Sequence, residues 1–392
     1  MKVALVAEWM DPWRGGAETS TQQFIHHLLD RGVELHIFTR SRFSSTPFMQ
    51  IHTISGASMS RTRRSMTFAH RVQRLLRNGS FDTIHAISPI KGADIYQPRG
   101  GTAAETIERN LALRKTLAGR SLKRCANVFN FKQRYLLTME REILGNDDGP
   151  VVVAISEYVV RQLKKHHGLP DERIRLIYNG VNPDESTEAE KAHDRATIRE
   201  EYKIAEHDIL VLLVAHNFRL KGVARWMEAL SMLLKRGIGN VRCALIGKGE
   251  SRHWHHLAAQ LGIRQRISFV GPSDRVGAFH HAGDVLVHPT YYDPCSRVVL
   301  EAMSAGLPCI TTRWDGAAEM IEDGVSGYVI DDPWDVSALA ERIERLRQPD
   351  IRQAIGTSAK QVSRRIGMER HADEMLALYE ESSSTAATQS TR

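Results

Sequence analysis

Short apolar runs with the character of buried β-strands alternate with helical patterns through both halves of this 392-residue sequence. In the first half these runs occupy residues 2–7, 33–39, 83–87 and 151–155. In the second half they occupy residues 209–215, 241–246, 267–270, 285–288 and 309–312. Strands that alternate with crossover helices, such as the helix predicted over residues 18–30, form parallel sheets, so the sequence predicts an α/β fold.

The chain is longer than a usual single hydrophobic core, which predicts two domains. The boundary is placed near Gly180, where Tyr-Asn-Gly-Val-Asn-Pro forms a turn before the charged residues 184–208. We therefore expect two Rossmann-like, doubly wound domains, residues 1–180 and 181–365, facing across a cleft. A C-terminal helix at about 366–382 is a candidate to pack back on the first domain. The Ser/Thr/Ala/Gln-rich residues 383–392 are expected to be disordered.

Composition limits the class and the environment of the protein. Hydrophobic residues make up 42% and charged residues 25% of the chain, the profile of a folded soluble protein. No apolar run approaches the roughly 20 residues that span a bilayer. Four cysteines show no metal-type or redox-type spacing, which favours a reducing, cytoplasmic location. The net charge of +7 suits an anionic partner.

Much of the positive charge lies in residues 109–141, which hold nine Lys or Arg and a single acid, Glu140. Leucines and aromatic residues are interspersed among these cations. One interpretation is a basic amphipathic region that lies on an anionic membrane surface, which would make the protein peripheral on the inner face of the cytoplasmic membrane. The alternative is a solvated helix face whose apolar side packs on its own domain.

The stretch from Asp293 to Glu301 follows the predicted strand 285–288 and opens a predicted helix. Ligands bind at the carboxyl edge of such sheets, and the free N–H groups of a first helical turn suit a phosphate. Two carboxylates beside that turn repel phosphate but can accept hydrogen bonds from sugar hydroxyls. Phosphate flanked by hydroxyl-rich rings is the chemistry of a nucleotide sugar.

Other predicted strand ends carry residues of the same kind. Arg219 and Lys221 follow the strand 209–215 and could neutralise a diphosphate, although they could also be ordinary surface cations. Gly15 and Gly16 follow the first strand and could let backbone approach a ligand, or could form a simple turn. Further small or glycine-rich strand ends occur at residues 245–250, at Gly271 (a candidate wall for a flat base) and at residues 316–319.

Taken together, these motifs resemble the family 4 retaining glycosyltransferases of the GT-B fold, the group that includes lipopolysaccharide-core glucosyltransferases. The resemblance covers nearly the whole chain and is strongest from Asn179 to Glu319. The acidic-x7-Glu element, the Arg/Lys-Gly loop, the Asn-Gly-Val-Asn turn and the early Gly-Gly pair occur in family order.

The resemblance implies roles for individual residues. Glu301 would hold ribose hydroxyls, Asp293 would contact the transferred sugar, and Lys221 with Arg219 would bind the diphosphate. The remaining donor-binding candidates are Gly15, Gly16, Asn217, Gly271 and the backbone amides of Cys295, Ser296 and Val298. Pro294 removes one amide donor from this turn. Asp293 is one methylene shorter than the usual family glutamate, and Arg219 precedes Lys221 by two residues.

The family transfers sugar with retention of anomeric configuration and requires no metal or other cofactor, and we find no Asp-x-Asp metal motif. The resemblance implies that the catalytic residues are Arg219, Lys221 and Asp293, with the cations taking the place of Mg²⁺.

The acceptor is expected to lie against the first domain. Candidate residues are His85, a weak acid/base candidate, Arg99, which could meet an anionic acceptor, and Gly100, Gly101 and Thr102.

We expect transfer of a hexose from a nucleotide sugar, with UDP preferred, to a cell-surface glycan or glycolipid such as lipopolysaccharide core. Mannosyl and other hexosyl transfers are rivals. The alternatives from other classes are a GT-B sugar-nucleotide epimerase and a non-catalytic nucleotide-sugar-binding protein. Nucleic-acid binding rests on charge alone and lacks a supporting motif.

Overall fold

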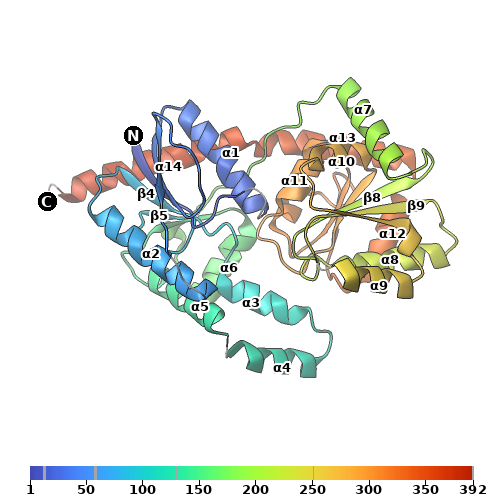
Figure 1. The fold of residues 1–392 in the computed structure, drawn as a ribbon, viewed down its shortest axis with the longest axis horizontal. Helices are drawn as coiled ribbons and strands as arrows, with labels where there is room; N and C mark the ends of the chain where they lie inside the picture. The colour runs from blue at the N-terminus through green and yellow to red at the C-terminus, as the bar shows by residue number, and fades with distance from the viewer. Residues whose placement is uncertain (12–14, 57–59, 129, 250, 391–392) are drawn as a thin grey trace. The chain divides into compact units, whose positions relative to one another are not determined.

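The computed structural model describes residues 1–11, 15–56, 60–128, 130–249 and 251–390. It divides into two compact units, Met1–Gly180 with Met368–Arg392, and Val181–Gly367 (Figure 1). Each unit is a parallel β-sheet covered by helices, so the predicted α/β fold is confirmed.

The sheet of the N-terminal unit has seven parallel strands in the order β3-β2-β1-β4-β5-β6-β7. Their bounds are β1 Lys2–Val6, β2 Glu34–Thr39, β3 Met49–Thr53, β4 Thr83–Ala86, β5 Ile95–Tyr96, β6 Val151–Ala154 and β7 Ile174–Leu176. The four predicted strands are present. Strand β3 was missed because, at the edge of the sheet, it lacks a buried apolar run, and β5 is only two residues long.

Seven helices of the described residues belong to this unit: α1 Gly16–Asp30, α2 Arg61–Arg77, α3 Ala103–Ala112, α4 Leu117–Val128, α5 Phe131–Leu144, α6 Glu157–His167 and α14 Met368–Ser390, with a short 3-10 helix, η2 Asp171–Arg173. Helices α1 and α14 share one hydrophobic cluster with strand β1, in which Phe24, Leu28, Met375 and Tyr379 are buried. The basic stretch that reads as one long region is divided among α3, α4 and α5.

Helix α14 corrects one expectation. Residues 383–390, expected to be disordered, continue the helix to Ser390. The segment from Met368 to Ser390 contains neither glycine nor proline, so nothing in the sequence ends the helix after its last fully buried residue, Tyr379. Residues 391–392 lie outside the described part of the chain.

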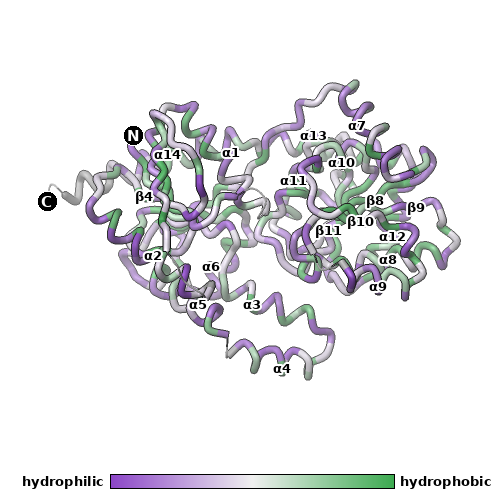
Figure 2. Tube along the Cα trace, viewed as in Figure 1, coloured by the Kyte–Doolittle hydropathy of each residue, from purple (hydrophilic) through white to green (hydrophobic). Residues whose placement is uncertain are grey.

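The sheet of the C-terminal unit has six parallel strands in the order β10-β9-β8-β11-β12-β13. The strands are β8 Ile209–Val214, β9 Val241–Ile246, β10 Ile267–Gly271, β11 Val285–His288, β12 Cys309–Thr312 and β13 Tyr328–Ile330. The helices are α7 Glu188–Glu201, α8 Val223–Lys235, α9 Ser251–Gln260, α10 Val276–Ala282, α11 Arg297–Ser304, α12 Val336–Arg345 and α13 Pro349–Ser363, with the short 3-10 helices η3 Arg264–Arg266, η4 Gly316–Met320 and η5 Arg364–Ile366. Hydrophobic residues concentrate in strands such as β8, whereas α7 is largely polar (Figure 2).

The carboxyl ends of the parallel strands meet at one edge of this sheet, as predicted. The loops that follow β8 and β11 touch there, and a glycine makes the approach feasible. Gly222 has φ +71°, and a Cβ at this position would lie 2.0 Å from the carbonyl oxygen of Pro289. Any other residue would push the loop that carries Lys221 away from the end of β11.

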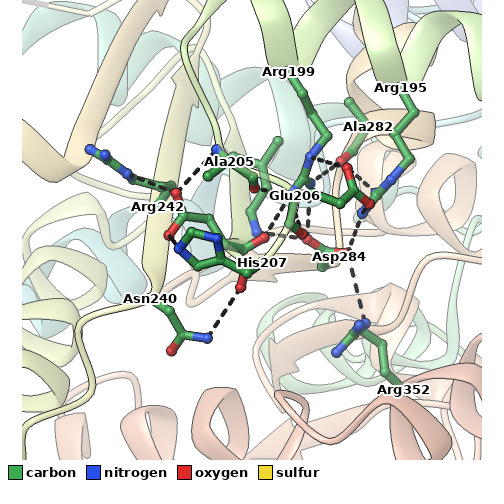
Figure 3. Close-up of polar contacts among 12 residues, drawn as sticks. Arg195, Arg199, Ala205, Glu206, His207, Asn240, Arg242, Ala282, Asp284 and Arg352 are labelled. Carbon is green, nitrogen blue, oxygen red and sulfur yellow. Dashed lines mark hydrogen bonds and ion pairs between the residues drawn. The ribbon is translucent and has the colours of Figure 1, made fainter.

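At the opposite edge, a buried aspartate fastens α7 to the sheet (Figure 3). Asp284, directly before β11, accepts hydrogen bonds from Arg195 Nη2 and Arg199 Nη1, each at 3.2 Å, and from the backbone N–H of Leu210 at 2.8 Å. The side chain of Arg199 is only 4% exposed, and Asp284 is the buried carboxylate that balances its charge. These bonds tie the largely polar helix α7, which packs against α10, to the start of β11.

We predict that Asp284→Ala destabilises the C-terminal unit by about 3–5 kcal/mol, because it leaves the Arg199 guanidinium buried without its carboxylate. Chemical denaturation followed by circular dichroism measures the loss. Glu206→Ala is the matched control: Glu206 also pairs with Arg195 and Arg199, but its side chain is 88% exposed, so the change should cost about 0.5 kcal/mol or less. Equal losses in the two variants would contradict the assignment.

Candidate active site

Lys221 and Asp293, predicted from separate motifs, form an ion pair at the carboxyl edge of the C-terminal sheet. The Lys221 ammonium donates to Asp293 Oδ2 at 2.5 Å and to the carbonyl oxygen of Tyr292 at 3.0 Å. Asn217 shapes the loop, because its side-chain oxygen accepts the backbone N–H of Leu220 at 3.2 Å and its carbonyl accepts that of Lys221 at 2.9 Å. Asn217 thus acts on the loop that presents the cation.

His288, the last residue of β11, completes this group, although no sequence motif marked it. Its Nε2 lies 3.2 Å from Asp293 Oδ2. Burial alone would raise the pKa of Asp293, but the charge of Lys221 and the hydrogen bond from His288 hold this pKa well below its usual range. Asp293 is therefore ionised and can only accept, so His288 Nε2 carries the shared proton.

The second predicted carboxylate, Glu301, lies on α11 one turn from Arg297. Arg297 Nε donates to Glu301 Oε1 at 2.6 Å, a side-chain pair with i,i+4 spacing. The Glu301 side chain remains 29% exposed, which leaves it accessible to a ligand. Arg297 was not predicted, although its position four residues before Glu301 on a helix is the signal that would have identified it.

The start of α11 differs from the expectation in one respect. The backbone N–H of Ser296, expected to bind the donor, already donates to Asp315 Oδ1 at 2.9 Å. The Ser296 side chain is 1% exposed, and its Oγ has no hydrogen-bond partner among the described residues. Ser296 can thus offer a ligand its hydroxyl but not its amide. Cys295 is buried and Val298 is half-buried beside it.

Asp315 was not predicted because it looks like an ordinary turn residue after β12. It is 1% exposed, and its Oδ1 accepts the backbone N–H groups of Ser296 and Ala317, both at 2.9 Å. Oδ2 lies 2.8 Å from Thr311 Oγ1. Burial and the nearby charge of Asp293 raise the pKa of Asp315 to about 6.

Two more predicted donor-side residues border open space at this edge. Arg219 is exposed, and its guanidinium makes no hydrogen bond or ion pair within the described part of the chain. Gly271 has φ +82°, and a Cβ built there would meet no atom within 4 Å. Arg219 is thus a cation free to bind an anion.

In the N-terminal unit, Gly15 precedes α1 and Gly16 is its first residue, as predicted. The carbonyl of Gly15 accepts the backbone N–H of Thr19 at 3.3 Å. Residues 12–14 of the same loop lie outside the described residues. The two glycines thus open a helix at the carboxyl end of β1, a position suited to an anion.

Two acceptor-side expectations are wrong. His85 is fully buried, bonds Tyr379 of α14 through Nδ1 at 2.7 Å, and burial lowers its pKa well below the usual range. Arg99 is also buried, with Nε on Gln97 Oε1 at 2.9 Å and Nη1 on Thr21 Oγ1 at 3.0 Å. Both residues belong to the core because α1 and α14 cover this part of the sheet, which the sequence pattern did not reveal.

The neighbouring turn is structural. Thr102 is buried and caps α3 by accepting the backbone N–H of Glu105 at 3.2 Å, and Gly101 closes the turn through a 2.8 Å bond to the carbonyl of Pro98. Of these candidate residues, Gly100 alone is exposed.

The carboxyl end of β1 holds a polar group that was not predicted. Glu8 is half-buried there and accepts a hydrogen bond from Ser65 at 2.9 Å.

One group of side chains among the described residues has the donor atoms of a metal site. Glu105, Glu108 and His166 place three such atoms within 4.8 Å of one another, on α3 and α6. Lys165 Nζ already lies 2.7 Å from Glu108 Oε2 and 3.4 Å from Glu105 Oε2. The group is therefore neutralised as an ion-pair cluster that joins the two helices.

Comparisons with known proteins agree with this geometry. Residues 14–185 match the model of Glycosyltransferase Family 4, and residues 194–362 match that of Glycosyl transferases group 1. The chain is 25% identical over 348 residues to the lipopolysaccharide glucosyltransferase WaaG of Escherichia coli, covering 88% of this chain and 90% of that protein.

Solved structures show the same fold. The crystal structure of WaaG matches with a TM-score of 0.82 at 23% identity, covering 96% of this chain and 99% of that one. Anabaena Alr3699/HepE, in complex with UDP and glucose, matches with a TM-score of 0.72 at 17% identity, over 97% of this chain and 100% of that one. The chain therefore belongs to the glycosyltransferases of the GT-B fold, with an N-terminal Family 4 domain and a C-terminal group 1 domain.

Proposed function

We propose that this glycosyltransferase moves a hexose from a UDP-sugar to a cell-surface glycan or glycolipid such as lipopolysaccharide core, with retention of configuration and without a metal. The observation that carries the proposal is the Lys221–Asp293 pair at the start of α11. The family resemblance supports retention, the likeness to HepE supports UDP, and the likeness to WaaG supports the acceptor class.

The diphosphate of the donor would be bound by Lys221, Arg219 and the start of α11. An ammonium has three N–H donors, and Lys221 uses two of them on Asp293 and on the Tyr292 carbonyl. The third can bind a phosphate oxygen while the ion pair stays intact. Arg219 adds a second cation, and the start of α11 adds the positive end of the helix dipole.

The reaction breaks the bond between the anomeric carbon and the terminal phosphate oxygen, and the bonding electrons pass to that oxygen. Preorganised positive charge beside this oxygen lowers the barrier, because it stabilises charge that develops only as the bond breaks. Asp293 and Glu301 would accept hydrogen bonds from hydroxyls of the transferred sugar and the ribose. The acceptor hydroxyl would attack the anomeric carbon from the face that the phosphate leaves, forming the new C–O bond, and its proton would pass to the departing phosphate oxygen.

We predict that Lys221→Ala lowers kcat by about a hundredfold or more, because the leaving phosphate loses a preorganised cation. Turnover of a UDP-sugar with a lipopolysaccharide-type acceptor measures this effect, and circular dichroism checks the fold. Lys235→Ala is the control, since Lys235 is an exposed cation at the far end of helix α8. Turnover at the wild-type level in Lys221→Ala would remove Lys221 from the mechanism.

We also propose that α4 and its flanks bind an anionic membrane surface. No helix in the described part of the chain is both long and apolar enough to cross a bilayer. Leu117, Leu122 and Phe131 are nevertheless 80%, 75% and 77% exposed, and helix α4 lies away from the sheet of its unit (Figure 1). Exposed apolar side chains among cations are the pattern of an interfacial helix rather than of one packed on its own domain.

Replacing Arg114, Lys115, Lys123 and Arg124 by Gln should weaken binding to vesicles that contain phosphatidylserine by at least about tenfold, because each cation near the surface contributes about 1 kcal/mol. Vesicle sedimentation measures the change. The control replaces four cations of the C-terminal unit, Lys235, Arg264, Arg364 and Arg365. Unchanged binding in the first variant would return this segment to a solvated helix face.

A further inference from the structure

The carboxyl group of Asp315 joins three segments at the floor of the donor site. Its Oδ1 holds the backbone N–H of Ser296, at the start of α11, and that of Ala317 in η4. The flanking backbone pairs with the turn that carries Asp293: Asp293 N–H donates to the carbonyl of Trp314 at 2.9 Å, and Gly316 N–H donates to that of Asp293 at 3.0 Å. Asp315 thus fixes the turn that positions Asp293 against Lys221.

The hydrogen bonds around Thr311 indicate the protonation state of this carboxyl group. Thr311 Oγ1 lies 2.8 Å from Asp315 Oδ2 and 3.1 Å from the carbonyl oxygen of His288. A hydroxyl has one proton to donate, whereas a carbonyl oxygen and an ionised carboxylate can only accept. With an ionised Asp315, one of the two contacts has no proton. With a proton on Oδ2, Asp315 donates to Thr311, Thr311 donates to His288, and both contacts are satisfied.

We propose that Asp315 is a positioning residue that works as a neutral acid in mildly acidic solution: in that form it holds the Asp293 turn and the start of α11 without adding a second negative charge to the site where the donor phosphates bind, and its ionisation at higher pH adds that charge. The part that concerns the donor rests on the proposed function.

The surrounding charges favour the neutral form. Burial raises the pKa of Asp315 most, and the nearby charge of Asp293, ionised through its pair with Lys221, raises it further. His288 and the backbone N–H groups of Ala317 and Ser296 lower it. Strand β12 contributes Cys309, whose pKa is raised, and α11 contributes the Arg297–Glu301 ion pair. The pKa of Asp315, about 6, lies above the usual value of 3.8, so the folded protein retains this proton into mildly acidic solution.

Ionisation of Asp315 has a direct consequence for an anionic ligand. The new charge would appear on the carboxylate oxygens that contact Ser296 N and Thr311 Oγ1. These oxygens lie at the edge of the sheet that carries Lys221, Arg219 and the start of α11. Repulsion between this charge and a diphosphate would weaken donor binding as the pH rises through about 6.

Asp315→Asn mimics the neutral acid. Its side-chain oxygen can accept both backbone N–H groups, and its NH₂ can donate to Thr311 Oγ1. Calorimetric titration with UDP-glucose, whose diphosphate does not titrate near pH 6, should show that the wild-type affinity falls about tenfold between about pH 5 and about pH 8. The variant should keep the low-pH affinity throughout. The same pH dependence in both proteins would overturn the proposal.

A second measurement needs no ligand and separates this proposal from the choice of donor. A carboxyl pKa that is raised on folding gives stability that is complete below the unfolded value of 3.8 and is lost as the pH rises through about 6. Asp315→Asn should therefore gain melting temperature relative to the wild type between about pH 4 and about pH 7. Asp331→Asn, at a 92% exposed side chain, is the control and should show no such trend. A difference independent of pH would overturn the proposal even if UDP-glucose binds.

If wild-type protein binds no UDP-sugar at any pH, the proposed donor is wrong, and the stability comparison alone decides the state of Asp315. In activity assays, Asp315→Asn should lower KM at neutral pH and remove the rise of KM with pH, because Asp315 acts on donor binding through its charge. A merely structural role would instead lower the melting temperature at every pH and change kcat and KM without a pH trend.

Discussion

The ion pair between Lys221 and Asp293 sets the requirements for the rest of the C-terminal unit. Two charges from different loops are brought together in a half-buried position, where their desolvation is tolerated only if the geometry is fixed. Parallel strands β8 and β11, neighbours in the sheet, bring the loops to one edge. Gly222 lets the loops touch. His288 forms a hydrogen bond with the Asp293 carboxylate, and the Tyr292 carbonyl accepts a second hydrogen bond from the Lys221 ammonium. Each of these features would be hard to explain in a sheet without a ligand site at that edge.

The site combines cations that are available to a ligand with carboxylates whose charge is locally balanced. Arg219 is exposed and Lys221 keeps one donor available, while Glu301 is paired with Arg297 and Asp293 with Lys221 and His288. The arrangement lets two carboxylates lie close to a diphosphate without repelling it. Asp315, when it is protonated in mildly acidic solution, organises backbone amides without adding charge. The electrostatics of the site are thus compatible with a ligand that is anionic in its centre and hydroxyl-rich at both ends.

Motifs close in sequence to a strand end were predictable. The fold class, five strands of the C-terminal sheet and the position of Lys221, Asp293 and Glu301 at one edge follow from the strand ends, because a parallel sheet brings its carboxyl ends together. His85 and Arg99 were misplaced because their burial depends on α1 and on α14, a helix nearly 300 residues away in sequence. His288 and Asp315 were missed because a histidine at a strand end and an aspartate in a turn are individually ordinary. Their roles follow only from the contacts in the folded protein, between His288 and Asp293 and between Asp315 and the backbone amides of Ser296 and Ala317.

We propose that this edge of the sheet binds a nucleotide sugar through its own cations. The most direct test is calorimetric titration of the purified protein with UDP-, GDP- and ADP-sugars in the presence of a metal chelator. UDP-sugars should bind without metal, and GDP- and ADP-sugars should bind much more weakly. Binding of no nucleotide sugar, or binding that appears only when a divalent metal is restored, would contradict this proposal.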